Sequence, residues 1–329
     1  MDLPRSAIGV VQVNHCDDGS AGPRQWFYDP FLTTPMVGTE HSPDEEPDTD
    51  PADAFGALSD PLRIDILRAL GDHHREAADE RAIGFADLRR RVGVDDSGRF
   101  RYHLERLRGN FVEKASDGYR LTFAGAKIVV AILMGTYTHA ISKEAVELDS
   151  DCFVCDDPAV ATYENGLCTV SCANDHLLFR WQVPPTAAAT ATLPEIVDVA
   201  GLLARQGMER TLDGYCPECY HAIESAVITE SVETPVFRAQ CETCGARLVC
   251  PAGYALLVDS RVVALYQRHG HDLHEYYLWD LPFIQERERY TLIEERSACL
   301  EIDVSVASET LSVALDETGH VVDYSLHEK

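Results

Sequence analysis

Lysine is scarce in this chain of 329 residues. Only four of its 28 basic residues are lysines, so the other 24 are arginines, and 55 acidic residues leave a formal net charge of -27. Carboxylate-rich surfaces hold water and tolerate strong screening, so this composition favours a halophilic protein, one that works in saturated cytoplasmic salt. The same negative charge opposes nucleic-acid binding unless positive charge is concentrated locally.

Long apolar runs are also missing. No stretch reaches the roughly eighteen apolar residues that mark a transmembrane helix. The first residues do not combine a basic segment with an apolar one, as a secretory signal would. We therefore expect a cytoplasmic protein without a membrane span. Met36 offers an alternative start that would leave only a short acidic tail before the first helix.

The eleven cysteines fall mostly in C-x-x-C pairs, which in a reducing cytosol are typical of metal ligation rather than of disulfides. Two such pairs lie 21 residues apart in the second half of the chain. Two knuckles of this kind complete a tetrahedron around zinc and leave no position for substrate, so this site is expected to be structural. Its predicted ligands are Cys216, Cys219, Cys241 and Cys244.

A second cluster is less regular. Its first knuckle, Cys152 and Cys155, lacks a matching pair, because a zinc-ribbon spacing would need a cysteine where Asp175 stands. His176 is the nearest suitable fourth ligand. Cys168 could take the place of His176, because it lies on the same side of an expected strand as Cys172. The predicted zinc ligands are Cys152, Cys155, Cys172 and His176.

The first half of the chain is patterned as helices around one hairpin. Asp60 and Pro61 indicate a helix start, because aspartate caps helices and proline fits their first position. Ala115–Gly118 separates two strand-like runs and indicates a hairpin turn. This order of elements is that of a winged helix domain. We expect helices over Pro51–Leu70, Phe85–Val92, Ser97–Gly109 and Ala124–Leu148, with the hairpin before the last.

The second half alternates strands with cysteine pairs, so the fold class is expected to be α+β. Thr192 and Glu195 form a capping-box pattern that opens a helix to about Met208, and another helix is expected over Tyr254–His269. Alternating apolar residues from Ala298 onward predict strands. The expected regions are a disordered acidic extension (1–51), a winged helix-turn-helix domain for DNA binding and dimerisation (52–148), a small zinc-ribbon-like module (149–190), and a helix, second zinc ribbon and C-terminal α+β region (191–329).

The helix over Ser97–Gly109, capped by Asp96 or Ser97, has two contrasting faces. One is apolar, and the other combines arginines with a tyrosine, groups suited to guanine edges and phosphates. From Phe85 to Lys127 ten basic residues face six acids, so this segment is positive in an acidic chain. The predicted DNA contacts are Arg89, Arg90, Ser97, Arg99, Arg101, Tyr102, Arg106, Lys114 and Arg120.

Several segments resemble the ArsR-type winged-helix regulators of haloarchaea. They are ALSDPLRIDILRAL, FADLRRRVGVDDSGRFRYHLERL and FVEKASDGYRLTFAGAKIV, within 52–148. The segment RVVALYQRHGHDLHEYYLWDL is similar to the region that follows in that group. The resemblance implies a homodimer on operator DNA, with the helices that flank the winged core as the interface. No cysteine lies between Cys16 and Cys152, so the metal sensing of that wider family is not expected.

These patterns together predict a sequence-specific, DNA-binding transcription regulator that acts as a homodimer with structural zinc. One alternative is an adaptor of the basal transcription machinery that contacts polymerase through the winged helix and zinc ribbon. An enzyme is the less favoured alternative, because no nucleophile elbow, phosphate-binding loop or metalloprotease pattern occurs. The histidine-rich stretch His269–His274 is more typical of a polar helix end than of a metal site.

Overall fold

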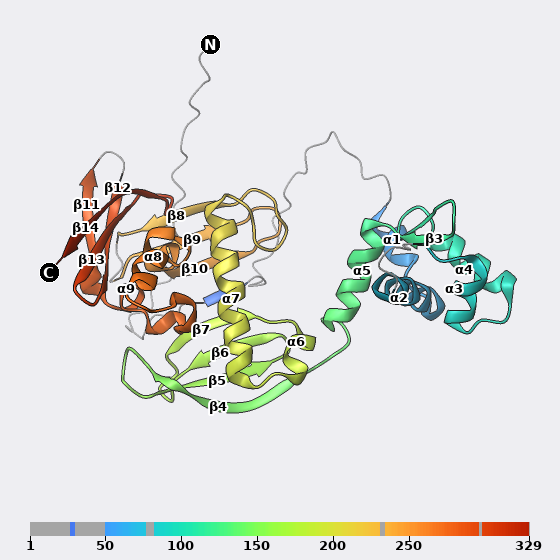
Figure 1. The fold of residues 1–329 in the computed structure, drawn as a ribbon, viewed down its shortest axis with the longest axis horizontal. Helices are drawn as coiled ribbons and strands as arrows, with labels where there is room; N and C mark the ends of the chain where they lie inside the picture. Colours follow the sequence, from blue (N-terminus) through green and yellow to red (C-terminus); the bar gives the residue numbers. More distant parts are fainter. Residues whose placement is uncertain (1–26, 30–49, 77–81, 231–233, 296–297, 329) are drawn as a thin grey trace, which may run out of the picture.

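The computed structural model describes residues 27–29, 50–76, 82–230, 234–295 and 298–328. The fold is mixed α+β, as expected, and the described residues contain three four-stranded sheets and one two-stranded sheet. Buried side chains form two separate hydrophobic cores, one in the N-terminal region and one in the C-terminal region. Figure 1 shows the two regions joined by the segment between helix α5 and strand β4, with the end of α5 beside helix α6 (Pro185–Thr190) of the C-terminal region.

The N-terminal region contains helices and one hairpin in the predicted order. Its elements are α1 (Pro51–Gly56), α2 (Pro61–Glu76), α3 (Phe85–Val92), α4 (Ser97–Leu107), β2 (Val112–Lys114), β3 (Tyr119–Leu121) and α5 (Phe123–Met134).

Side-chain caps fix where these helices start. The backbone N–H of Leu62 donates to Asp60 Oδ1 at 2.9 Å, so Asp60 caps α2. At the start of α4, Asp96 rather than Ser97 is the cap, because Asp96 Oδ1 accepts from the N–H groups of Gly98 and Arg99 at 2.8 and 3.0 Å. The predicted caps of α2 and α4 are therefore confirmed, but the single helix expected over Pro51–Leu70 is interrupted at residues 57–60, which separate α1 from α2.

The apolar face of α4 is buried as predicted. Phe100, Leu104 and Leu107 are almost inaccessible to solvent and belong to the same core as Ile66 and Leu67 of α2. This burial leaves the opposite face of α4 toward solvent.

The long helix predicted over Ala124–Leu148 is wrong beyond Met134. Gly135 ends α5 in the left-handed conformation, with φ of 71°, and donates to the carbonyl of Ile132. Residues 142–151 form strand β4 (Ser142–Asp151) instead, paired with β5 (Pro158–Glu164). Alanine, glutamate and leucine in β4 favour a helix locally, but tertiary pairing overrides that preference.

Residues 1–51, predicted to be disordered, lie mostly outside the described residues. Within them, β1 (Phe27–Asp29) pairs antiparallel with β10 (Arg247–Pro251), so this part of the prediction is wrong. Three residues are too few for a hydrophobic pattern to reveal, and they become a strand only because β10 offers an edge.

The C-terminal region surrounds one long helix, α7 (Leu193–Leu212), which contacts strands of both sheets that carry cysteine clusters. One sheet has the order β4-β5-β6-β7, and the other the order β1-β10-β9-β8. The elements not yet given are β6 (Leu167–Ser171), β7 (Leu177–Gln182), β8 (Glu224–Ile228) and β9 (Val236–Gln240).

The capping box of α7 is present, since the N–H of Thr192 donates to Glu195 Oε2 at 2.7 Å. The helix predicted over Tyr254–His269 is interrupted: a 3-10 helix, η1 (Ala252–Val258), precedes α8 (Ser260–Arg268), and Asp259 caps α8.

The last sheet has the order β11-β12-β13-β14. The predicted alternation of buried residues is seen from Leu300 to Val306, whereas all five residues from Leu311 to Leu315 are buried. No described helix is both long and apolar enough to cross a membrane. The remaining elements are η2 (Leu273–Glu275), η3 (Leu278–Asp280), α9 (Pro282–Gln285), η4 (Arg287–Arg289), β11 (Tyr290–Glu295), β12 (Ala298–Val306), β13 (Glu309–Leu315) and β14 (Val321–Glu328).

Gly125 allows α5 to approach the base of the hairpin. A Cβ atom there would overlap the carbonyl oxygen of Phe111. We expect Gly125→Ala to lower the free energy of unfolding of the N-terminal region by about 1–3 kcal/mol, the usual cost of overpacking. Urea unfolding measures this change. The control is Gly56→Ala, where an added Cβ meets no atom within 4 Å; an equal loss in both variants would contradict the packing described.

Candidate metal centres and basic helix face

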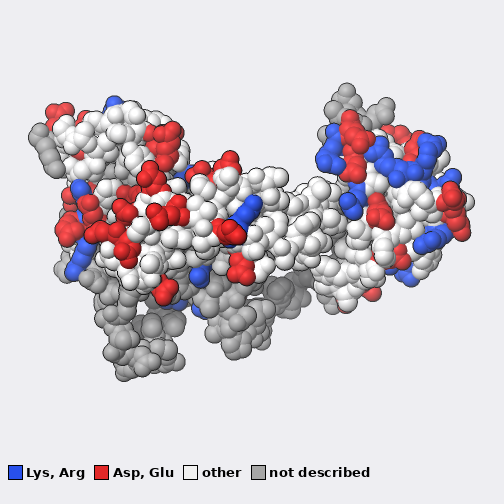
Figure 2. Space-filling model, turned by 90° about the horizontal axis from the view of Figure 1, so that it is seen from below, with Lys and Arg blue, Asp and Glu red and all other residues white. Residues whose placement is uncertain are grey.

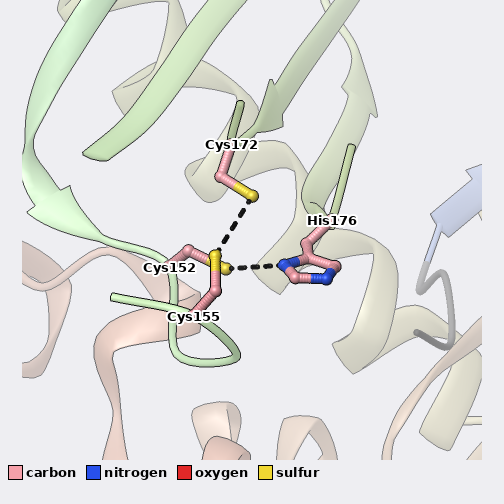
Figure 3. A group of neighbouring side chains, drawn as sticks. All are labelled: Cys152, Cys155, Cys172 and His176. Carbon is pink, nitrogen blue, oxygen red and sulfur yellow. Dashed lines mark hydrogen bonds between the residues drawn. The ribbon is translucent and has the colours of Figure 1, made fainter. Parts of the chain in front are cut away.

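The first cysteine cluster joins two loops at one end of the β4-β5-β6-β7 sheet. Cys152 and Cys155 come from the loop between β4 and β5, and Cys172 and His176 from the loop between β6 and β7. Figure 3 shows the four side chains converging. Cys152 Sγ lies 3.4 Å from His176 Nδ1, and Cys155 Sγ lies 3.7 Å from Cys172 Sγ.

The second cluster is built in the same way on the neighbouring sheet. Cys216 and Cys219 precede β8, and Cys241 and Cys244 occupy the loop between β9 and β10. Two Sγ–Sγ distances, from Cys216 to Cys244 and from Cys219 to Cys241, are both 3.6 Å.

These distances fit metal tetrahedra. Metal–sulfur bonds of about 2.3 Å at tetrahedral angles place two sulfur atoms about 3.8 Å apart, and a sulfur and an imidazole nitrogen about 3.6 Å apart. A disulfide would need about 2.0 Å. In each cluster all four ligand atoms lie within 4.8 Å of one another. Both predicted ligand sets are therefore brought together, and each can hold a metal ion.

Three of the four ligand loops share one backbone pattern. The N–H of the first cysteine donates to the carbonyl five residues later, as Cys216 does to His221 at 2.8 Å and Cys241 does to Ala246 at 2.9 Å. Cys152 does the same to Asp157 at 2.7 Å. These bonds curl the backbone so that both thiols of a C-x-x-C pair point to one side.

The loop that carries His176 departs from this pattern. Here Cys172 donates to the carbonyl of His176 itself, only four residues later, at 3.2 Å. Asn174 in this loop donates through Nδ2 to Cys155 Sγ at 3.4 Å and to Asp157 at 2.5 Å. The side chain of His176 is longer than that of a cysteine and so reaches the site from outside the tight turn. The side-chain amide of Asn174 contacts the sulfur of Cys155.

Cys168 does not belong to the first centre. Its side chain is fully buried in the hydrophobic core, and burial raises the pKa of its thiol to about 12. Strand alternation does put Cys168 and Cys172 on one side, but three residues of β6, 169–171, separate Cys168 from the loop that holds the ligands, and Cys168 is not among the four converging side chains. The choice that the sequence left open therefore falls on His176.

Backbone donors favour the thiolate form at one cysteine of each cluster. Burial alone would raise the pKa of the Cys241 thiol, but hydrogen bonds, first from the N–H of Cys244, outweigh it and lower that pKa. The pKa of Cys172 is lowered against burial by the N–H of His176. Burial instead raises the pKa of Cys152 to about 11. A metal ion must displace the remaining protons, so metal affinity should fall as the solution is acidified.

The histidine-rich stretch does not form a metal site within the described part of the chain. His269 Nε2 contacts Glu309 Oε2 at 3.0 Å, and His274 Nδ1 contacts Asp272 at 3.1 Å. His271 contacts the hydroxyl of Tyr276. These side chains link α8 and the following loop to their neighbours rather than converging.

The outward face of α4 carries the predicted DNA-contact residues. Arg99, Arg101, Tyr102 and Arg106 are all exposed. The Arg106 guanidinium carbon lies 5.7 Å from the centre of the Tyr102 ring, and that of Arg101 lies 5.2 Å from the ring of Phe85. Figure 2 shows basic side chains gathered on the smaller lobe, while the visible face of the larger lobe carries mainly acids.

Some of the other predicted contacts have partners within the chain. Arg89 is half-buried and donates to the carbonyls of Val94 and Asp95 at 2.9 and 2.5 Å, so it fixes the turn between α3 and α4. The sequence did not reveal this role. Arg90 pairs with Asp87 at 2.7 Å, and Arg120 with Glu113 at 2.6 Å. Ser97 and Lys114 are exposed.

Removal of one ligand tests the second metal centre. We expect Cys241→Ser to release one metal ion per chain and to unfold the C-terminal region around it, because a centre with a missing ligand no longer joins its two loops. The N-terminal region, with its own core, should stay folded. Elemental analysis and circular dichroism measure both effects. Cys299→Ser is the control, since Cys299 lies outside both clusters; full metal content in Cys241→Ser would contradict the assignment.

Two family models match the chain, and both describe domains of unknown function. One (DUF7347) matches residues 51–132, which cover α1 to α5. The other (DUF7351) matches residues 149–321, which contain all eight clustered ligands and more than half of the chain. No curated protein matches. The chain therefore belongs to the family described as a domain of unknown function (DUF7351).

Proposed function

We propose that this chain is a sequence-specific DNA-binding transcription regulator whose N-terminal region is a winged helix-turn-helix. Helix α4 is the recognition helix, and the β2–β3 hairpin is the wing. The observation that carries the proposal is the two-sided character of α4. Its apolar face is anchored in the core, while its exposed face presents Arg99, Tyr102 and Arg106 in a strongly acidic chain.

The geometry around α4 suits entry into a major groove. Asp96 caps its first turn, and Arg89 holds the turn before it, so the basic side chains project from a rigid support. Rigid placement is what base recognition requires, because bidentate hydrogen bonds to guanine tolerate little displacement. Lys114 is exposed at the end of β2, and we propose that it contacts the phosphate backbone.

We propose that zinc occupies both metal centres and that it is structural. Zinc favours tetrahedral sites of thiolate and imidazole, and a four-ligand set leaves no open position for a substrate. Both sites lie beside the shared core that contains α7, and their ligands Cys152, Cys216 and Cys241 are buried.

We further propose a homodimer formed through α5. This helix is apolar on more than the side that its own core covers: Phe123 is 80% exposed, Leu133 is 50% exposed, and Val130 and Met134 are also exposed. Lys127 lies over the Phe123 ring at 5.2 Å. A second copy of α5 would cover this surface in the manner that the resemblance to ArsR-type regulators implies.

Replacement of the exposed residues of α4 tests the DNA-binding proposal. A random pool of duplex DNA, selected on the full chain at high salt, supplies the probe sequence. We expect the triple variant Arg99→Ala, Tyr102→Ala and Arg106→Ala to lose binding to it. Arg99→Ala alone should weaken binding by about 1–3 kcal/mol and relax base preference.

The matched control is Arg238→Ala, an exposed arginine of β9 in the C-terminal region. Its DNA affinity should be unchanged. If the triple variant binds the selected DNA as well as the unchanged chain does, α4 is not the recognition helix. A chain that selects no sequence but binds polymerase would instead be an adaptor.

A charge introduced on α5 tests the dimer. We expect Leu133→Asp to turn a dimer into a monomer, because the carboxylate would be buried without a partner at the interface. Light scattering at micromolar concentration measures the mass. The matched control is Leu202→Asp, at a similarly exposed leucine of α7 in the C-terminal region, which should remain dimeric. A monomeric mass for the unchanged chain would contradict the proposal.

A further inference from the structure

The edge strands of the sheets differ in how they are protected from pairing with another chain. Unprotected edges attract foreign strands, so proteins interrupt them with bulges or cover them. Strand β4 has two register shifts against β5, and β11 has one against β12. Strand β8 is covered by a turn, where the N–H of Val227 donates to the carbonyl of Glu317 at 2.7 Å.

Strand β14 has neither a register shift nor a covering turn over its last six residues, and only the N–H of Tyr324 has a side-chain acceptor there, Asp323 Oδ1 at 2.8 Å, which pairing would have to displace. Asp323–Glu328 pairs in unbroken register with Glu309–Ala314 of β13. Within the described part of the chain, β13 is its only strand partner, so the other edge of β14 is unpaired. No lysine or proline occurs in this stretch. These are the properties of a strand that can accept another strand.

Two apolar side chains of β14 extend beyond the core of the sheet. Tyr324 and Leu326 lie opposite the buried residues Val313 and Leu311, and therefore on the face that covers the core. Nevertheless they are 54% and 45% exposed.

The position of Tyr324 is fixed before any partner arrives. The Arg261 guanidinium carbon lies 4.7 Å from the centre of the Tyr324 ring. Arg261 is itself held by Asp259, with Nη2 2.7 Å from Oδ2 and Nε 3.1 Å from Oδ1. The exposed ring therefore loses little conformational entropy when it is covered.

We propose that β14 pairs antiparallel with β14 of a second copy of this chain, around a two-fold axis at Ser325. In this register Tyr324 lies opposite Leu326 of the second copy, and Asp323 lies opposite His327 of the second copy. Symmetry makes each pair occur twice. The pairing joins the two β11-β12-β13-β14 sheets into one continuous sheet.

The sequence of β14 favours this axis and a second copy as the occupant. Tyr324 and Leu326 meet each other, and each Asp323 carboxylate meets an imidazole that can donate to it, while Val322 meets Glu328. An axis at Asp323 would instead place two carboxylates opposite each other, which is unfavourable. A strand that complements itself in both polarity and charge requires no other partner.

This contact is separate from the proposed α5 interface and does not depend on DNA binding. If both contacts lie in one pair of chains, the dimer is held at both ends; if they lie in different pairs, two dimers associate. Either arrangement would fix the two C-terminal regions relative to each other. That this happens on DNA rests on the proposed function.

A cysteine at the axis tests the pairing directly. Residues opposite each other in an antiparallel pair have Cα atoms about 4.5–5.5 Å apart, within the range that a disulfide spans. We expect the full chain with Ser325→Cys to form a covalent dimer under mild oxidation. The control is Thr291→Cys, an exposed position on β11 at the opposite edge of the sheet, which should crosslink no more than the unchanged chain.

The register is tested by mixing Asp323→Cys chains with His327→Cys chains. A covalent dimer should form in the mixture and not in either variant alone. Crosslinking of each variant with itself would overturn the proposed axis. If Ser325→Cys crosslinks no better than the control, the edge of β14 does not pair with a second copy and the proposal is wrong.

A charge on the apolar face supplies an independent test. With the α5 contact removed by Leu133→Asp, we expect Leu326→Lys to weaken the remaining self-association at least about tenfold, measured by sedimentation. Leu292→Lys, at an exposed position of β11, should leave it unchanged. Equal association in the two variants would overturn the proposal, whatever the DNA-binding assays show.

Discussion

The C-terminal region depends on two metal-binding clusters. Each cluster consists of four side chains from two loops. The sheets on which they lie are made of strands of three to ten residues, and a metal ion bound to each cluster would fix the end of one sheet. Helix α7 then contacts both sheets, so one hydrophobic core covers what the sequence suggested were two modules. The match of one family model to residues 149–321 is consistent with this single unit.

Charge is distributed unevenly along the chain, with basic residues concentrated in one segment of an acidic protein. The chain carries 55 acidic residues, yet α4 and its surroundings are basic because arginines gather on the one face that its core leaves exposed. Local positive charge of this kind is what DNA requires, and acidic surroundings limit contacts elsewhere. The apolar surfaces of α5 and β14 add two further exposed places in the part of the chain that the structure describes.

The sequence predicted those elements that are determined by neighbouring residues, such as helix starts and C-x-x-C turns. Asp60, Asp96 and Gly135 are short-range signals, and of these only Gly135 was overlooked, which extended α5 into what is a strand. The ligand sets followed from spacing, because a C-x-x-C turn is itself local. The exclusion of Cys168 could not be predicted, since it depends on where β6 ends. Nor could the role of Arg89, which depends on carbonyls of the following turn.

X-ray absorption at the metal edge of the unmodified protein, purified without chelator, tests the central claim most directly. The two four-ligand centres together contain seven sulfur atoms and one imidazole nitrogen. We therefore predict two zinc ions per chain, with sulfur at about 2.3 Å as the dominant ligand and a minor nitrogen contribution at about 2.0–2.1 Å. Fewer than two ions per chain, or a first shell rich in oxygen, would contradict the account.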